Sequence, residues 1–264
     1  MPSGNGRTLI TGASTGIGLE LAREFARHGH PLILVARNEP RLNEIATQLN
    51  QAHHVEVTVI PCDLGKSHGP MELFAAVGQR NLQVDILVNN AGVMDTRALK
   101  DAETDTLLGM VRLNVEAVTA LTSLFLKPMV ARGTGRILNV ASLAAFQPLP
   151  SMAVYAASKA YVLSLTEALA EELRGKGVTV SALCPGFTDT NMVENAKREN
   201  AAFRALPSAL MADPKPVAQD GYRACMSGEV IRVPGIALQM ATGLIQAQRS
   251  LTRVVTGFFG RRAL

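Results

Sequence analysis

Tyr155 and Lys159 stand four positions apart in the run Tyr155-Ala-Ala-Ser-Lys159, at the start of a long stretch with helical spacing. Residues four apart lie on one face of a helix, so the two polar groups would be neighbours. A free tyrosine has a pKa of about 10, too high for efficient proton transfer near neutrality. A lysine ammonium within a few ångströms favours the phenolate and could lower that pKa by roughly one to three units. The pair can then exchange a proton with an oxygen atom of a substrate.

A glycine-rich turn near the N-terminus could hold phosphate groups. It reads Thr11-Gly12-Ala13-Ser14-Thr15-Gly16-Ile17-Gly18 and stands between a short aliphatic run and a stretch with helical spacing. Glycines let the backbone approach a pyrophosphate closely, and the N-terminus of the following helix offers free N–H groups. A tight strand-to-helix loop needs glycine in any case. Its position after the first strand and before a helix nevertheless favours dinucleotide binding.

Other reactive side chains point to no second kind of chemistry. Ser142 could be a hydrolase nucleophile, but Ala141-Ser142-Leu143 lacks the glycines of a nucleophile elbow. The histidines fall away from the carboxyl ends of the predicted strands, so surface positions are expected and no metal site is predicted. They are His28, His30, His53, His54 and His68. The cysteines have neither metal-like nor disulfide-framework spacing, and they are expected to be reduced thiols. They are Cys62, Cys184 and Cys225.

The elements that must position these groups alternate between short aliphatic or β-branched runs and longer helical stretches. Such alternation predicts an α/β fold, a three-layer doubly wound parallel sheet in a single domain. The predicted strands are Thr8–Thr11, Leu32–Ala36, Val55–Pro61, Ile86–Asn89, Arg136–Ala141, Val178–Leu183 and Val230–Val233. The predicted helices are Gly18–His28, Arg41–Gln51, Met71–Gly78, Thr104–Ala131, Ala153–Arg174 and Pro216–Met226.

Two regions depart from this alternation. Phe187–Asp213 has weak periodicity and is predicted to be a lid or a substrate loop. Residues 1–235 are predicted to form the catalytic domain, and 236–264 a helical tail of that domain, because the tail carries apolar residues at helical spacing. The tail could contact a partner subunit, cover the substrate cleft or rest on a membrane, and the first two are favoured over the membrane.

The glycine spacing resembles the Thr-Gly-x-x-x-Gly-x-Gly signature of the short-chain dehydrogenase/reductase family. Further motifs resemble the same family, and they are Asp63, Asn89-Asn90-Ala91-Gly92, Asn114, Ser142, Tyr155 with Lys159, and Pro185-Gly186. The resemblance runs from about Arg7 to about Val233, after which Pro234-Gly235 and the tail replace the family's common Asp-Gly-Gly ending. It implies a Rossmann fold and an NAD(P)(H)-dependent enzyme that interconverts a carbonyl and an alcohol by hydride transfer.

The resemblance also implies a catalytic set of Asn114, Ser142, Tyr155 and Lys159. In it, Tyr155 protonates the alkoxide that hydride delivery forms, and Ser142 holds the carbonyl oxygen. The backbone at Asn114 would hold a water in a proton relay with Lys159, which also contacts the nicotinamide ribose. Without the other motifs, Tyr155 and Lys159 could simply be two residues on the face of an ordinary amphipathic helix. The full set together with the glycine turn favours catalysis.

By the same resemblance, Asp63 would bind the adenine amino group and Asn90 the adenosine ribose. Asp63 could also cap the helix that follows, and Asn89-Asn90-Ala91-Gly92 alone could be a plain turn. The expected cofactor contacts are Gly12, Ser14, Thr15, Gly16, Ile17, Gly18, Arg37, Asp63, Leu64, Asn90, Ala91, Gly92, Tyr155, Lys159, Pro185, Gly186 and Thr188.

The end of the second strand indicates which dinucleotide is bound. An acidic residue that binds the 2′-hydroxyl of NAD should stand there, but the strand ends Val35-Ala36-Arg37 and Glu39 lies too far into the turn. A guanidinium could pair with a 2′-phosphate instead. Arg37 could also be an exposed loop arginine. NADP(H) is therefore predicted, and NAD(H) remains the alternative.

The loops at the strand ends predict an apolar substrate side. The expected substrate contacts are Met94, Ser142, Ala144, Phe146, Met152, Phe187 and Met192. Most are apolar, which favours a hydrophobic ketone, aldehyde or secondary alcohol, although the same residues could simply pack their loops. Two other functions stay open. One is a non-catalytic nucleotide sensor or scaffold, which the complete catalytic set disfavours, and the other is a dehydratase or epimerase, which usually has a longer chain.

Charge and hydropathy narrow the partners. The formal net charge is +4, from 26 basic and 22 acidic residues, and the basic residues are scattered except near the C-terminus. A solvated surface is therefore favoured over a nucleic-acid site. Neither a signal-peptide core nor an apolar run long enough to cross a bilayer is evident, so the cytoplasm is expected. A homodimer or homotetramer is also expected, because the family commonly assembles through helices that correspond to Thr104–Ala131 and Ala153–Arg174, both rich in apolar residues.

Overall fold

A parallel sheet forms the centre of the molecule. The structure, a computed structural model, describes residues 6–207 and 210–235, so the predicted tail 236–264 lies outside the described residues. Within them the sheet has seven strands in the order β3-β2-β1-β4-β5-β6-β7, and every neighbouring pair is parallel. The strands are β1 Arg7–Thr11, β2 Leu32–Ala36, β3 Val57–Pro61, β4 Val84–Asn89, β5 Gly135–Val140, β6 Val178–Leu183 and β7 Ile231–Arg232.

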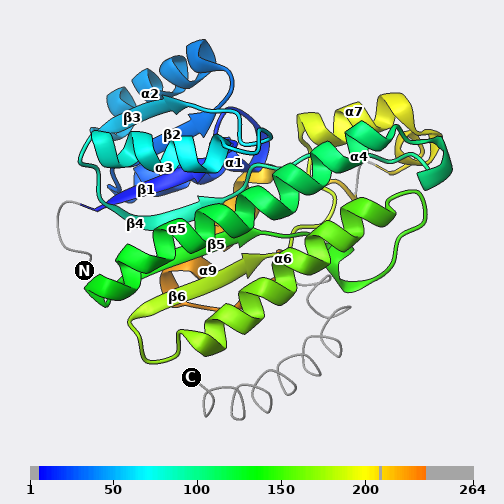
Figure 1. The fold of residues 1–264 in the computed structure, drawn as a ribbon. Helices are drawn as coiled ribbons and strands as arrows, with labels where there is room; N and C mark the ends of the chain where they lie inside the picture. Colours follow the sequence, from blue (N-terminus) through cyan, green and yellow to red (C-terminus); the bar gives the residue numbers. More distant parts are fainter. Residues whose placement is uncertain (1–5, 208–209, 236–264) are drawn as a thin grey trace.

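Helices cover both faces of this sheet (Figure 1). They are α1 Gly16–Arg27, α2 Glu39–His53, α3 Gly69–Gln79, α4 Thr104–Val111, α5 Ala117–Arg132, α6 Ala153–Glu172, α7 Asn191–Glu199, α8 Ala201–Arg204 and α9 Pro214–Ser227. The predicted strands and helices all occur, with bounds that differ by at most two residues. The three-layer doubly wound fold is therefore confirmed. Strand order reverses between β1 and β4, and ligands of such sheets bind at that reversal, beyond the carboxyl ends of the strands.

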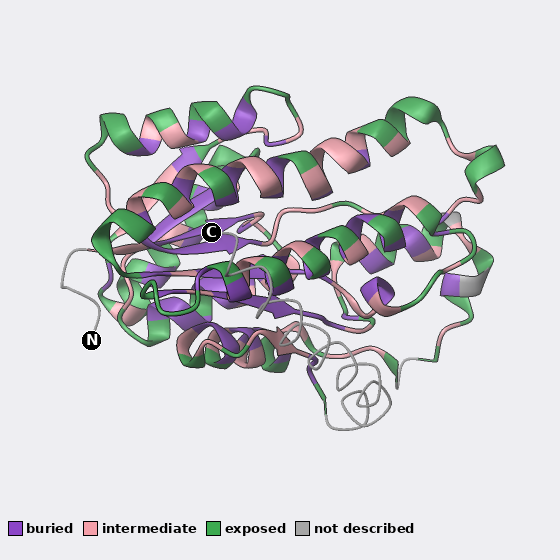
Figure 2. Cartoon of the chain, turned by 60° about the horizontal axis from the view of Figure 1, so that its bottom comes forward, coloured by how far each residue is buried: buried purple, intermediate pink, exposed green. Residues whose placement is uncertain are grey.

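Alternating side chains of the strands build two separate layers of core. Leu9 and Leu87 pack with α3 and α5 on one face, whereas Ile10, Ile86 and Leu138 pack with α1, α2 and α9 on the other. Successive residues of a strand point to opposite faces, so a strand that is covered on both sides must be apolar throughout. Figure 2 shows the buried strands between helices that are buried only on their inner sides.

The predicted helix Thr104–Ala131 is continuous but irregular. A π-helical turn, Arg112–Glu116, joins α4 to α5 and contains Asn114. The whole helix, Thr104–Arg132, is the one helix of the described residues that is long and apolar enough to cross a membrane, with a mean hydropathy of 1.3 over an 18-residue window that is 33% buried. The sequence analysis identified no such segment. The inner side of this helix packs on the sheet through Leu121, Phe125 and Met129, as in a core helix of a layered domain.

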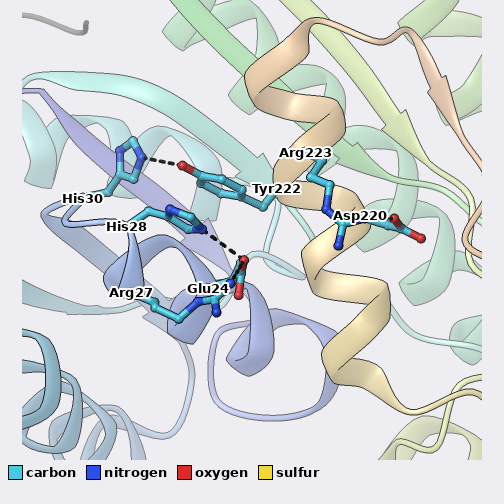
Figure 3. A network of polar contacts seen from close by, with 7 residues as sticks. All are labelled: Glu24, Arg27, His28, His30, Asp220, Tyr222 and Arg223. Atoms are coloured by element: carbon cyan, nitrogen blue, oxygen red, sulfur yellow. Dashed lines mark hydrogen bonds and ion pairs between the residues drawn. The ribbon is translucent and has the colours of Figure 1, made fainter.

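An aromatic cluster joins the C-terminal end of α1 to α9 (Figure 3). The Tyr222 ring of α9 stacks on His28 with centroids 4.2 Å apart and meets Phe25 edge-on at 5.0 Å. Its hydroxyl lies 3.5 Å from Nε2 of His30, and Nε2 of His28 lies 3.2 Å from the Glu24 carboxylate. Burial, His28 and Arg136 lower the pKa of His30. These contacts hold α1 in place at the end opposite its glycine turn.

Candidate functional site

The carboxyl ends of the strands open into a cavity of about 950 Å³. Every residue expected to contact the cofactor lines this cavity, as do all but one of the residues expected to contact the substrate. The exception is Phe146. The five histidines are exposed or half-buried and lie outside the cavity lining, and among the described residues no group of His, Cys, Asp and Glu side chains is arranged to hold a metal ion.

The glycine turn leads into the N-terminus of α1, and both line the cavity. Gly12 and Gly16 have φ values of +65° and +56°, which L side chains rarely adopt. Thr15 makes no side-chain cap, and the first turn of α1 carries no acidic residue. The positive end of the helix dipole therefore faces the cavity with main-chain donors that no side chain satisfies. This arrangement fits the pyrophosphate of a dinucleotide.

Asn90 fixes this glycine turn to the loop after β4. Its Nδ2 donates to the carbonyl oxygens of Thr11 (2.9 Å) and Gly12 (3.2 Å). The Thr11 hydroxyl in turn accepts hydrogen bonds from the main-chain N–H groups of Asn90 and Ala91. The sequence analysis expected Asn90 to contact a ribose, which stays a prediction. In the structure the Asn90 carboxamide holds the glycine turn and the loop after β4 together.

The adenosine side of the cavity carries two cations. Arg37 lies exposed at the end of β2 and lines the cavity, and no salt bridge involves it among the residues that the structure describes. Lys66 also lines the cavity and was not anticipated, because nothing in its local sequence marks it. Asp63 accepts a hydrogen bond from Gly65 N–H at 3.0 Å, so it caps the turn that begins there. The contact of Asp63 with adenine stays a prediction.

Tyr155, Lys159 and Ser142 meet where the cofactor side and the substrate side join. Tyr155 and Lys159 lie in the first two turns of α6 and are 7% and 5% exposed, and Ser142 follows β5. The lysine Nζ donates to the carbonyl oxygen of Val140 at 2.9 Å and lies 5.8 Å from the centroid of the tyrosine ring. The Ser142 side chain hydrogen-bonds to Tyr155. One acid and one further hydroxyl therefore face the same point of the cavity.

The protonation of this pair differs from the sequence-based expectation. Lys159 was expected to lower the pKa of Tyr155. Burial instead raises the pKa of the Tyr155 phenol, and the hydrogen bond with Ser142 offsets this only in part. Burial also lowers the pKa of Lys159 to about 8. The physical reason is that desolvation disfavours the charged form of each group. Tyr155 therefore carries its proton at neutral pH and, without a bound cofactor, is a weaker acid than a free tyrosine.

Asn114 lies outside the cavity lining and connects to Tyr155 through hydrogen bonds. It is 1% exposed, and its Oδ1 accepts from Val93 N–H at 3.0 Å while its Nδ2 donates to the Val93 carbonyl at 2.9 Å. The same Nδ2 donates to Ser158 Oγ, which donates to the main-chain carbonyl of Tyr155 at 2.7 Å. The π-helical turn shifts the main-chain hydrogen bonds of the helix at this point. Asn114 thus connects the loop after β4 to the start of α6.

Apolar side chains line the remaining part of the cavity. Met94, Ala144, Met152, Phe187 and Met192 lie there as predicted. The expectation for Phe146 is wrong, because its ring packs against the cluster that contains Ala141, Val162, Cys184 and Val233. The 3-10 turn Leu143–Phe146 directs it away from the cavity. Further lining residues that the sequence analysis missed are Thr106, Met110, Leu113, Gln147, Leu149, Val193 and Leu210.

The predicted lid Phe187–Asp213 contains two helices, α7 and α8, that the sequence analysis did not identify. Their lengths are nine and four residues, too short for apolar periodicity to reveal. Figure 1 shows α7 beyond the strand ends, beside α4. Val193, Ala196 and Phe203 pack with Met110 and the Tyr155 ring. The segment therefore covers Tyr155 on the apolar side of the cavity.

Known proteins are similar to this chain in sequence and in fold. The family profile described as short chain dehydrogenase matches residues 7–201. A putative ketoacyl reductase of Streptomyces coelicolor is 39% identical over 191 residues, which span 72% of this chain and 73% of that protein. The structure of a short-chain dehydrogenase from Sphingobium yanoikuyae in complex with NADPH has a TM-score of 0.84 at 29% identity and covers 94% of each chain. That of a bulky-bulky ketone specific alcohol dehydrogenase from Comamonas testosteroni has a TM-score of 0.80 at 29% identity, covering 95% of this chain and 94% of its own.

Proposed function

This chain belongs to the short-chain dehydrogenase/reductase family and is an enzyme that acts on CH–OH and C=O groups with NAD(P), and we propose that it uses NADPH to reduce a bulky apolar ketone or aldehyde. The observation that carries the proposal is the position of Tyr155. Its phenol is protonated at neutral pH, because the ordinary pKa of tyrosine is about 10 and burial raises it further. It lies between a cavity region suited to a dinucleotide and a region lined by apolar side chains.

Ser142, Tyr155 and Lys159 have separate roles in this reduction. A bound nicotinamide dinucleotide supplies the hydride. Ser142 donates a hydrogen bond to the carbonyl oxygen, and Tyr155 gives its proton to the same oxygen as negative charge develops there. Lys159, whose pKa of about 8 leaves it mostly charged at neutral pH, stabilises the phenolate that remains. The link from Asn114 through Ser158 fixes the main chain at Tyr155.

The preference for NADPH rests on Arg37 with support from Lys66. Both line the adenosine side of the cavity, where a 2′-phosphate would add about two negative charges. The complex of the Sphingobium yanoikuyae dehydrogenase with NADPH agrees with this choice. In a site that bound NAD(H) by its 2′-hydroxyl we would expect a carboxylate at the end of β2, and Arg37 stands there instead.

Arg37→Ala should weaken NADPH binding about tenfold to a hundredfold and leave NADH binding nearly unchanged, because a charge-assisted hydrogen bond contributes roughly 1.5–3 kcal/mol. Fluorescence titration with both nucleotides measures this. Arg41→Ala is the matched control, because Arg41 lies one turn further on, pairs with Glu44 and is outside the cavity lining. Equal losses for the two nucleotides would show that Arg37 does not contact the phosphate.

The apolar lining supports the choice of substrate. Met94, Met110, Met152 and Met192 contribute four flexible thioether side chains to one region, and methionine adapts to irregular apolar shapes. We therefore expect NADPH oxidation to be faster with bulky aryl or alicyclic ketones than with small or carboxylated ketones of similar reactivity. An absorbance assay across such a panel tests this. NADPH binding without turnover of any carbonyl would favour a nucleotide sensor, and elimination of water from hydroxy substrates would favour a dehydratase.

The outer sides of α5 and α6 support an oligomer. Only a third of the most apolar window of Thr104–Arg132 is buried, and Val130 of α5 and Tyr161 of α6 are exposed. The two helices lie side by side, with Thr119 Oγ1 2.9 Å from the Tyr161 hydroxyl. An apolar surface shared by two adjacent helices suits a self-complementary interface. We propose at least a homodimer through this surface, in the cytoplasm.

A further inference from the structure

The segment that covers the substrate side begins and ends at neighbouring positions in the structure. Thr188 and Ala212 form a parallel bridge, with hydrogen bonds from Asp189 N–H to the Ala212 carbonyl and from Ala212 N–H to the Phe187 carbonyl. The described residues between them, 189–207 and 210–211, include α7 and α8 and are here called the roof. Because both ends of the roof are fastened at the same place, its middle is the part that can move furthest. Asn200 is midway between Asp189 and Met211.

Asn200 joins the roof to the opposite side of the cavity. It lies between α7 and α8, and its Nδ2 donates to the main-chain carbonyl of Thr96 at 2.8 Å, across 104 positions of sequence. The roof follows β6, whereas Thr96 belongs to the loop after β4, and β5 lies between these strands in the sheet. The hydrogen bond therefore closes the roof over the end of β5, where Ser142 is placed.

Both partners of this contact are well supported. The Asp95 carboxylate accepts hydrogen bonds from the main-chain N–H of Arg97 at 2.8 Å and from its guanidinium, which fixes the turn that presents the Thr96 carbonyl. On the roof side, Asn200 N–H donates to Ala196 and its carbonyl accepts from Arg204 N–H. Next to it, Phe203 meets the Phe187 ring edge-on at 5.7 Å and packs in the cluster of Tyr155.

We propose that Asn200 is a positioning residue that latches the roof onto the Thr96 carbonyl and so sets the shape of the substrate side over Tyr155. This rests on the proposed reduction of a bulky carbonyl in that region. A hydrogen bond between neutral groups contributes about 0.5–1.5 kcal/mol, or about twofold to tenfold in an equilibrium constant, enough to favour the closed roof and small enough to be lost during each substrate exchange. Binding of the adenosine half of the cofactor should not depend on the latch, because the glycine turn and Arg37 follow β1 and β2, on the other side of the sheet reversal from β4 and β6.

Two substitutions separate the hydrogen bond from the shape of the side chain. Asn200→Ala removes the donor, and Asn200→Asp keeps the shape but turns an acceptor toward the Thr96 carbonyl. We expect both to raise the KM for a bulky ketone, about twofold to tenfold for Asn200→Ala and at least as much for Asn200→Asp. The KM for NADPH should stay within twofold. Asn195→Ala and Asn195→Asp are the controls, because Asn195 is an exposed residue of α7, and both should behave like the unaltered enzyme.

Limited trypsin digestion gives a second readout that needs no catalysis. Lys197, Arg198 and Arg204 lie in the roof, and cleavage there reports the population of the open roof. Both Asn200 variants should be cut in the roof about twofold to tenfold faster, with cleavage elsewhere unchanged. An Asn200→Asp variant with unaltered ketone KM and unaltered roof cleavage would overturn the latch, as would a parallel rise in both KM values with a lower melting temperature. The proposed function would survive either result if the unaltered enzyme reduces ketones.

Discussion

Replacement of Tyr155 by phenylalanine is expected to lower carbonyl reduction by about two to four orders of magnitude, because it removes the positioned acid and leaves the ring that packs in the cavity wall. Burial raises the pKa of the phenol, so the proton is present at neutral pH and leaves only as negative charge develops on the substrate oxygen. The ring itself is 7% exposed and would stay in the cluster with Met152 and Phe203. Steady-state NADPH oxidation with the best ketone measures the loss.

Tyr161→Phe is the matched control, since Tyr161 lies on the same helix but is 39% exposed and contacts Thr119 rather than the cavity. It should retain full turnover. For Tyr155→Phe, NADPH affinity and melting temperature should also be nearly unchanged, which separates loss of the proton from loss of the fold. Turnover of Tyr155→Phe within tenfold of the unaltered enzyme would mean that another group donates the proton.

Gly18→Ala is expected to reduce turnover at low NADPH by about a hundredfold, because it forces apart the two sides of the phosphate cradle. A Cβ at Gly18 would overlap the Gly12 carbonyl oxygen and Nδ2 of Asn90, both of which are fixed. Either the glycine turn or the N-terminus of α1 must move, and a displacement of about 1 Å can cost about a hundredfold in rate. Overpacking should also cost about 1–3 kcal/mol of stability. NADPH titration and thermal unfolding measure the two effects.

Gly78→Ala provides the control for this prediction. Gly78 is also a helical glycine, in α3, but a Cβ there would meet nothing within 4 Å. Alanine is the better helix former, so this variant should be as stable as the unaltered protein or slightly more stable, with unaltered NADPH affinity. If the Gly18→Ala variant has the same NADPH affinity as the Gly78→Ala variant, then NADPH binding does not require α1 to approach the loop after β4 closely.

Features that depend on neighbouring residues are determined by the amino-acid sequence itself. The strands and the helices other than α7 and α8 are predicted to within two residues, because each carries its own hydrophobic period. The glycine turn is assigned to the cofactor because its residues are consecutive and stand between a strand and a helix. Tyr155 and Lys159 are placed together for a similar reason, since four residues of helix bring them to one face. All of these are local relations, which a linear pattern contains.

Tertiary structure alone decided relations between distant residues and the effects of burial. Phe146 is close in sequence to Ser142, yet a 3-10 turn directs it into another cluster. The pKa of Tyr155 is raised rather than lowered, because desolvation is a property of the packed environment and not of the Tyr-x-x-x-Lys spacing. The bond from Asn200 to Thr96 spans 104 positions, and no periodicity relates two such loops. They meet because β4 and β6 flank β5 in the sheet, and the order of strands is set by the packing of the whole chain.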